Sequence, residues 1–160
     1  MEVDELLGEL RRRGATLATA ESLTGGRLAA RITTVPGASR TFLGGVVAYA
    51  SDAKQHLLGV PAGLVARHGV VSAECARAMA EGARAALGAT WAVSTTGVAG
   101  PDEQEGKPVG TVFVGVAGPT GTTVVALELV GDREAVQERT CREAVSALGA
   151  RLHGEEPGLR

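Results

Sequence analysis

The sequence predicts a single-domain α/β fold with three layers, in which helices cover both faces of a mixed, mostly parallel sheet with a C-terminal antiparallel hairpin. Segments with strand and helix patterns alternate through most of the 160 residues, which favours parallel strands joined by crossover helices. Glycine and alanine supply 23 and 27 residues, whereas aromatic residues make up 2% of the chain. The core is therefore expected to consist of Ala, Val and Leu on closely approaching backbones.

The first elements alternate helix, strand and helix. Apolar residues at helical spacing predict a helix over 2–13, which closes with three arginines followed by Gly14. A short apolar run predicts a buried strand over 15–20. The glycine-containing turn 21–26 leads into a helix over 26–34, so backbone N–H groups are expected at the start of that helix.

The middle of the chain is mainly helical. A strand rich in glycine and valine is predicted over 42–50, followed by short helices over 51–58 and 61–68. An alanine-rich helix over 72–87 begins at Ser72, a residue type that caps helix N-termini. These helices form a crossover, which favours a next strand that is parallel to the earlier ones.

The remaining elements include the hairpin. A buried strand is predicted over 91–95, and a loop over 96–108 carries several glycines and prolines. Strands over 109–117 and 122–130 are joined by a short Gly-Pro turn and are expected to pair antiparallel. A last helix over 132–152 begins with Asp132 as its N-cap.

Composition and charge exclude several classes of protein. Sixteen Lys and Arg against eighteen Asp and Glu give a net charge of −2, with no basic stripe for nucleic acid. No run approaches the ~20 apolar residues of a membrane span, and the first residues lack the pattern of a signal peptide. We therefore expect a cytoplasmic protein with no membrane or nucleic-acid partner, a domain over 1–152 and a disordered tail over 153–160.

No metal and no cofactor are predicted. Cys75 and Cys141 lie far apart without CxxC spacing, so both are expected to be core thiols. The three histidines, His56, His68 and His153, lie outside the glycine turns and are expected at the surface. No cluster of ligand-type residues has the spacing of a metal site.

Lysine is rare in this chain. The sixteen basic residues are fourteen Arg and two Lys, Lys54 and Lys107. A desolvated lysine can lose its proton near physiological pH and arginine cannot, so only lysine can act as a general base. The choice of lysine at these two positions therefore needs a specific reason.

Ser22 is a candidate nucleophile because it lies in the turn between a predicted strand and a helix. A small nucleophile is exposed at such a turn, and the amides that follow it can hold an oxyanion. On this segment alone, simpler interpretations stay open. Ser22 or Thr24 can be the N-cap of the helix, and Glu21 can be a surface carboxylate.

Lys54 follows the second predicted strand, shortly after Tyr49, the single tyrosine of the chain. Taken in isolation, such a residue is more often a solvated lysine on a short helix. Taken with Ser22, it has a functional interpretation, because ligands collect outside the carboxyl ends of the strands in open α/β sheets. A serine beside a lysine of lowered pKa is a nucleophile and base pair that needs no histidine or metal.

Two further turns are candidate phosphate sites. Gly97 and Gly100 follow the third predicted strand, where backbone amides can cradle an anion and where glycine can equally serve turn geometry alone. Arg133, in the first turn of the last helix, either reaches a phosphate or points outward. The acidic run 102–105 is expected to be solvated.

Taken together, these segments resemble the successive signatures of the CinA C-terminal domain family over about residues 5–150. Their order and spacing match the family, although each motif alone is weak. The matching segments are 20–26 (AESLTGG), 44–49 (GGVVAY) with Lys54 and 57–60 (LLGV), 69–74 (GVVSAE), 96–101 (TGVAGP), 107–112 (KPVGTV) and 131–133 (GDR).

The resemblance implies a nicotinamide-nucleotide amidohydrolase, which converts nicotinamide mononucleotide to nicotinate mononucleotide and ammonia in pyridine-nucleotide recycling. It makes Ser22 and Lys54 the catalytic pair and places Tyr49 and Thr96 in the same site. It also implies a stand-alone domain and a homodimer or higher homo-oligomer. A non-catalytic nucleotide-binding regulatory module is the alternative, and the presence of Ser22, Tyr49 and Lys54 together favours the enzyme.

The expected mechanism gives roles to the other motif residues. Amides of the turn after Ser22 stabilise the oxyanion, and the later glycines with the arginine hold the 5′-phosphate. Two positions depart from the family pattern: Gln137 stands where an arginine is usual, and Arg27 stands where an apolar residue is more common. The expected substrate-binding residues are Glu21, Thr24, Gly25, Gly26, Gly97, Gly100 and Arg133.

Overall fold

A mixed five-stranded sheet in the order β2-β1-β3-β4-β5 runs through the middle of the computed structural model, which describes residues 1–154. Strand β1 pairs in parallel with β2 and β3, whereas β3 pairs antiparallel with β4, and β4 with β5. The predicted mixed sheet with a C-terminal hairpin is confirmed. The strands are β1 (Leu17–Glu21), β2 (Phe42–Val47), β3 (Trp91–Gly97), β4 (Thr111–Gly118) and β5 (Gly121–Glu128).

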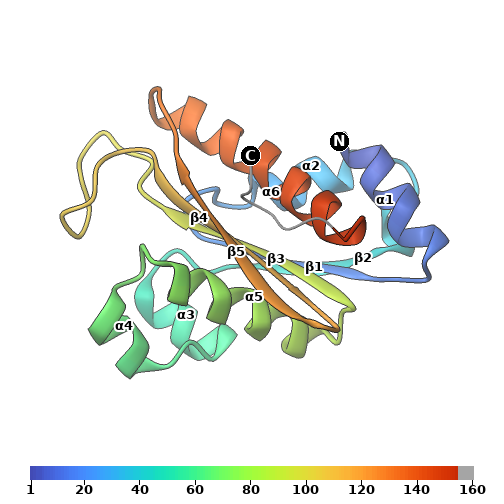
Figure 1. Cartoon of the computed structure of the whole chain (residues 1–160), viewed down its shortest axis with the longest axis horizontal. Helices are drawn as coiled ribbons and strands as arrows, with labels where there is room; N and C mark the ends of the chain where they lie inside the picture. Colours follow the sequence, from blue (N-terminus) through green and yellow to red (C-terminus); the bar gives the residue numbers. More distant parts are fainter. Residues whose placement is uncertain (155–160) are drawn as a thin grey trace.

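Helices cover both faces of this sheet (Figure 1). One face carries α1, α2 and α6, and the other carries α3, α4 and α5. The bounds agree with the sequence prediction to within a few residues, except that the short 3₁₀ turn η1 (Ala38–Arg40) was not predicted. The helices are α1 (Val3–Arg12), α2 (Arg27–Thr33), α3 (Ser51–Leu58), α4 (Ala62–His68), α5 (Ala73–Leu87) and α6 (Arg133–Leu152).

The alternation of side chains along β1 separates two hydrophobic layers. Leu17 packs into the cluster beneath α1, α2 and α6, whereas Ala18 and Ala20 belong to the cluster beneath α5. The small residues on the second face let α5 approach closely, so that Ser94 Oγ in β3 donates a hydrogen bond of 2.6 Å to the carbonyl of Ala76. The abundance of alanine is thus explained by close helix–sheet packing.

Local signals in the sequence predicted several details. Ser72 and Asp132 cap α5 and α6 by accepting hydrogen bonds from the N–H groups of Cys75 and Ala135. Cys75 and Cys141 are free and buried, and all three histidines are exposed, as expected. Within residues 1–154, no helix is both long and apolar enough to cross a membrane. Most of the expected tail, residues 155–160, lies outside the described residues.

The topology brings three loops to one edge of the sheet. Since β1, β2 and β3 are parallel, their carboxyl ends at Glu21, Val47 and Gly97 meet at the same edge. The segments that follow these strands are those in which the sequence placed its candidate site residues.

Candidate active site

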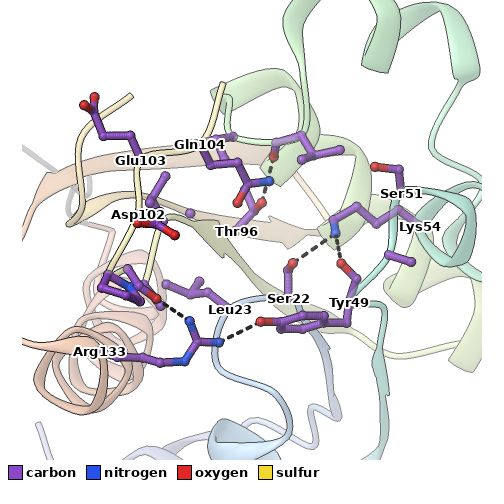
Figure 2. Close-up of a pocket in the computed structure, with 18 residues that line it drawn as sticks. Ser22, Leu23, Tyr49, Ser51, Lys54, Thr96, Asp102, Glu103, Gln104 and Arg133 are labelled. Atoms are coloured by element: carbon purple, nitrogen blue, oxygen red, sulfur yellow. Dashed lines mark hydrogen bonds between the residues drawn. The ribbon is translucent and has the colours of Figure 1, made fainter. Parts of the chain in front are cut away.

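A cavity of about 410 Å³ opens at the carboxyl ends of the three parallel strands (Figure 2). It is lined by residues from five separate segments of the chain, among them Ser22, Lys54, Val70, Thr96 and Arg133. The rule that ligands bind outside the carboxyl ends of strands in open α/β sheets therefore located this cavity correctly.

Lys54 reaches Ser22 from α3. Its Nζ donates a hydrogen bond of 2.9 Å to Ser22 Oγ and two others, of 2.9 and 3.1 Å, to the carbonyls of Ala48 and Tyr49. The Lys54 side chain is fully enclosed, with the residue only 1% exposed. The interpretation of Lys54 as a solvated surface lysine is therefore wrong.

The surroundings of Lys54 favour its neutral form. Burial lowers the pKa of Lys54, and the charges of Cys75 and Glu105 act in the opposite direction. Because burial raises the pKa of Cys75 itself to about 11, that thiol is protonated at neutral pH. The carboxylate of Glu105 is thus the charge that opposes the effect of burial at neutral pH.

The three hydrogen bonds of Lys54 also orient its lone pair. A neutral amine has two N–H groups and one lone pair, so it can donate two hydrogen bonds and accept a third. The carbonyls of Ala48 and Tyr49 can only accept hydrogen bonds, so they take the two N–H groups. The lone pair then points at Ser22 Oγ, where it can accept the hydroxyl proton.

The Glu21 side chain holds the turn that carries Ser22 in place. The Glu21 carboxylate accepts hydrogen bonds from Thr24 Oγ1 at 2.7 Å and from the N–H groups of Leu28 and Ala29 at 2.8 and 3.0 Å. Glu21 is 1% exposed, so it is not a surface carboxylate. The N-cap of α2 is Gly26, at a φ of 101°, rather than either hydroxyl residue of the turn.

The hydrogen bonds of the turn decide which amides remain available. The N–H of Gly25 donates to the carbonyl of Ser22, and the N–H of Ser22 donates to Thr95. In the described part of the chain, the N–H groups of Leu23 and Thr24 have no such acceptor. Of these two residues Leu23 lines the cavity, so its amide, directly after the nucleophile, is the available oxyanion donor.

Gln137 occupies the position where the family pattern suggests an arginine. It is buried in α6, and its Nε2 donates a hydrogen bond of 2.9 Å to the carbonyl of Leu23. The amide thus ties the Ser22 turn to α6. Arg27, the other departure from the pattern, is exposed and does not line the cavity.

Arg133 and Tyr49 meet across the cavity. The Arg133 guanidinium donates hydrogen bonds to the Tyr49 hydroxyl at 2.7 Å and to the carbonyl of Gly100 at 2.5 Å, as Figure 2 shows. Arg133 therefore turns over the cavity instead of pointing outward. Tyr49 has two separate contacts, because its carbonyl binds Lys54 while its 60%-exposed side chain binds Arg133.

The other predicted residues divide into two groups. Thr96 lines the cavity and its Oγ1 donates a hydrogen bond of 2.7 Å to the carbonyl of Val70. Gly97 and Gly100 also line the cavity. The structure does not place the remaining predicted binding residues in the lining, and these are Glu21, Thr24, Gly25 and Gly26.

The acidic run after Gly100 is exposed, as expected, and it also has contacts that the sequence did not predict. Asp102, Glu103 and Gln104 line the cavity, and the Glu105 carboxylate accepts hydrogen bonds from backbone N–H groups. The position of the run between the Gly-Pro motif and Lys107 was the only sequence signal for these contacts. Within residues 1–154, no group of three or more His, Cys, Asp or Glu is placed to hold a metal ion.

Comparisons with known proteins identify the family of this chain. A model of the CinA C-terminal domain matches residues 2–152. The CinA-like proteins of Frankia casuarinae and Anaeromyxobacter dehalogenans are both 51% identical to this chain, over 149 and 146 residues. These alignments cover 93% and 91% of this chain but 34% and 36% of those proteins, so the chain spans about a third of their length.

Solved structures of the same superfamily are also similar. A CinA superfamily protein from Klebsiella pneumoniae superposes with a TM-score of 0.91 at 34% identity, covering 96% of this chain and 99% of that one. A competence/damage-inducible protein from Agrobacterium tumefaciens gives 0.90 at 32% identity, covering 94% and 93%.

The buried carboxylate beneath the nucleophile turn gives the first prediction. Glu21→Gln should lower the free energy of unfolding by about 2 kcal/mol, because an amide cannot accept all the hydrogen bonds made to this carboxylate. Urea denaturation measures the effect, and Glu81→Gln on the exposed side of α5 serves as the control. Equal stability of Glu21→Gln and the control would contradict this role.

Proposed function

Because the chain belongs to the CinA C-terminal domain family, we propose that it is an amidohydrolase that converts nicotinamide mononucleotide to nicotinate mononucleotide and ammonia. The observation that carries the proposal is the hydrogen bond from Lys54 Nζ to Ser22 Oγ inside the cavity. A buried lysine with a lowered pKa beside a serine is an activated nucleophile.

The first half of the reaction forms an acyl-enzyme. Neutral Lys54 takes the proton of Ser22 Oγ while that oxygen attacks the carboxamide carbon. The negative charge that develops on the amide oxygen is stabilised by the free N–H group of Leu23. When the carbon–nitrogen bond breaks, the Lys54 ammonium returns its proton to the departing nitrogen, which leaves as ammonia.

The second half hydrolyses the ester. A water molecule gives a proton to Lys54 as it attacks the acyl carbon, and the amide of Leu23 again holds the oxyanion. Collapse of this intermediate breaks the bond to Ser22 Oγ, and Lys54 returns the proton to the serine. The product forms as the carboxylic acid and loses its proton to solvent to become the carboxylate, and the enzyme is regenerated without any other reactant.

The cavity suits a nucleotide that carries a pyridinium ring and a phosphate. Arg133 uses two N–H groups on Tyr49 and Gly100, and a guanidinium has further donors for a phosphate. Asp102 and Glu103 supply negative charge to the same lining, which favours the positively charged ring.

Removal of the nucleophile gives a direct test. Ser22→Ala should reduce ammonia release from nicotinamide mononucleotide by roughly 10³-fold or more, because the pair acts as one unit. Ser39→Ala, the same change at an exposed residue of η1, is the matched control. Near-normal turnover by a folded Ser22→Ala protein would rule out the serine as nucleophile.

The protonation state of Lys54 predicts the pH dependence. Activity requires the neutral amine, and burial lowers the pKa of Lys54 from 10.5, so kcat/KM should rise with pH through an apparent pKa below 10.5. Lys54→Arg should bind the nucleotide and release no ammonia at neutral pH, because guanidinium retains its proton. Lys54→Met checks the result with a side chain that fits the buried site more easily.

Two outcomes would contradict this assignment. An active Lys54→Arg protein would eliminate the lysine as base. A wild-type protein that binds the nucleotide without releasing ammonia would favour the regulatory module instead.

Phosphate selection can be measured with two substrates. Nicotinamide mononucleotide should exceed nicotinamide riboside in kcat/KM by at least about two orders of magnitude, or roughly 3 kcal/mol. Arg133→Gln should narrow this ratio about tenfold or more. Arg139→Gln, an exposed change further along α6, should leave the ratio unaltered. Equal efficiency of the wild type on both substrates would contradict phosphate recognition.

A further inference from the structure

Glu105 adopts a backbone conformation that side chains other than glycine rarely adopt. Its φ is 55°, and it is the single non-glycine residue with a positive φ among residues 1–154. Such conformations cost free energy and persist where the surrounding structure enforces them. Contacts of the side chain should therefore account for this conformation.

The carboxylate of Glu105 binds a distant turn. Its two oxygens accept hydrogen bonds of 2.9 Å each from the N–H groups of Val70 and Val71, at the turn before α5. The preceding residue, Gly69, has a φ of 77°, and a Cβ there would lie 2.6 Å from both carboxylate oxygens. Only a glycine at position 69 therefore leaves room for this carboxylate.

Lys107 reinforces the same connection. Its Nζ donates a hydrogen bond to the carbonyl of Val71, and its backbone forms an isolated bridge with Gln104. The bridge between Gln104 and Lys107 thus closes the loop that contains Glu105. The side chains of Glu105 and Lys107 both bind the turn before α5.

The bound turn forms part of the active-site cavity. Val70 and Val71 line it, and the carbonyl of Val70 accepts the hydrogen bond from Thr96 Oγ1. On the other side of the connection, Asp102 and Glu103 line the same cavity. The carboxylate of Glu105 therefore joins two segments of the cavity wall that are separated by about thirty residues in the sequence.

We infer that Glu105 is a positioning residue for the proposed deamidation: by binding the N–H groups of Val70 and Val71, its carboxylate fixes the cavity wall beside Lys54 and supplies a fixed negative charge there. The effect that we expect on catalysis rests on the proposed function. The contact between the loop and the turn can be measured without any catalytic activity.

The negative charge of Glu105 gives this role an effect on the pKa of Lys54 that a contact acting only to hold two segments together would not have. Lys54 Nζ contacts the Ser22 hydroxyl and two backbone carbonyls, and the other titratable or charged groups around it are Cys75 in α5, Glu105, Lys107 at the carbonyl of Val71, and Asp102, Glu103 and Arg133 in the cavity lining. Glu105 raises the pKa of Lys54 against the effect of burial. Loss of its charge should lower that pKa, so the neutral amine would appear at lower pH.

The test compares Glu105→Gln, which keeps the size of the side chain, with Glu105→Gly, which removes the carboxylate and suits the positive φ. Glu74→Gln, at an exposed residue in the first turn of α5, is the matched control for loss of charge near the same turn. Amide exchange of Val70 and Val71 measures the connection. NMR titration of lysine labelled at Cε measures Lys54 directly, since the chain has two lysines.

Glu105→Gly should exchange the amide hydrogens of both Val70 and Val71 about tenfold faster or more, because both lose their acceptor, whereas Glu105→Gln keeps one acceptor oxygen and should speed the exchange of at least one of them. The titration of Lys54 and the acid limb of kcat/KM should move to lower pH, and kcat/KM at the optimum should fall about tenfold. Glu74→Gln should change none of these quantities.

The contrary outcomes separate the two proposals. Unchanged amide exchange or an unmoved Lys54 titration in both Glu105 variants would overturn the positioning role, whatever the activity. Faster exchange with an unmoved pH profile and normal kcat/KM would also overturn it, because the contact would then be structural only. A wild-type protein that releases no ammonia would overturn the proposed function, while exchange and titration still decide the role of Glu105.

Discussion

The amino group of Lys54 inside the protein is the constraint on which the rest of the site depends. A buried ammonium is costly unless an opposite charge compensates it, yet the hydrogen-bond partners of Lys54 are two carbonyls and the Ser22 hydroxyl. Within the described chain, no salt bridge involves this lysine. The site therefore stabilises a neutral amine that is directed at a serine, which is the arrangement that an amine base requires.

The sheet topology makes this arrangement possible. Because β1 lies between β2 and β3 and is parallel to both, the chain leaves the same edge of the sheet three times. Ser22 follows β1. The segment after β2 provides the carbonyls of Ala48 and Tyr49 and leads to Lys54, and Thr96 lies at the end of β3. No single segment contains a complete site, so the pair exists only when the sheet is formed.

The sequence predicted what local signals determine. Ser72 and Asp132 marked helix starts through their own side chains, and the strand-to-turn rule located the catalytic candidates. The sequence alone could not predict features that depend on contacts between residues far apart in the chain. The burial of Lys54 arises from packing, so the local interpretation as a solvated lysine failed. The carboxylate of Glu105 binds amides more than thirty residues earlier, and no local pattern in the acidic run indicates such a contact.

The charge distribution of the cavity also has a consequence for the proposed reaction. Arg133 is the permanent cation among the lining residues, while Asp102 and Glu103 add two carboxylates and burial lowers the pKa of Lys54. A pyridinium nucleotide carries a negative phosphate, which Arg133 attracts, and a positive ring, which Asp102 and Glu103 attract. Deamidation then adds a negative charge to the ring, where the carboxylates of the wall oppose it. The same charges that favour the substrate therefore disfavour the product, which promotes release after each turnover.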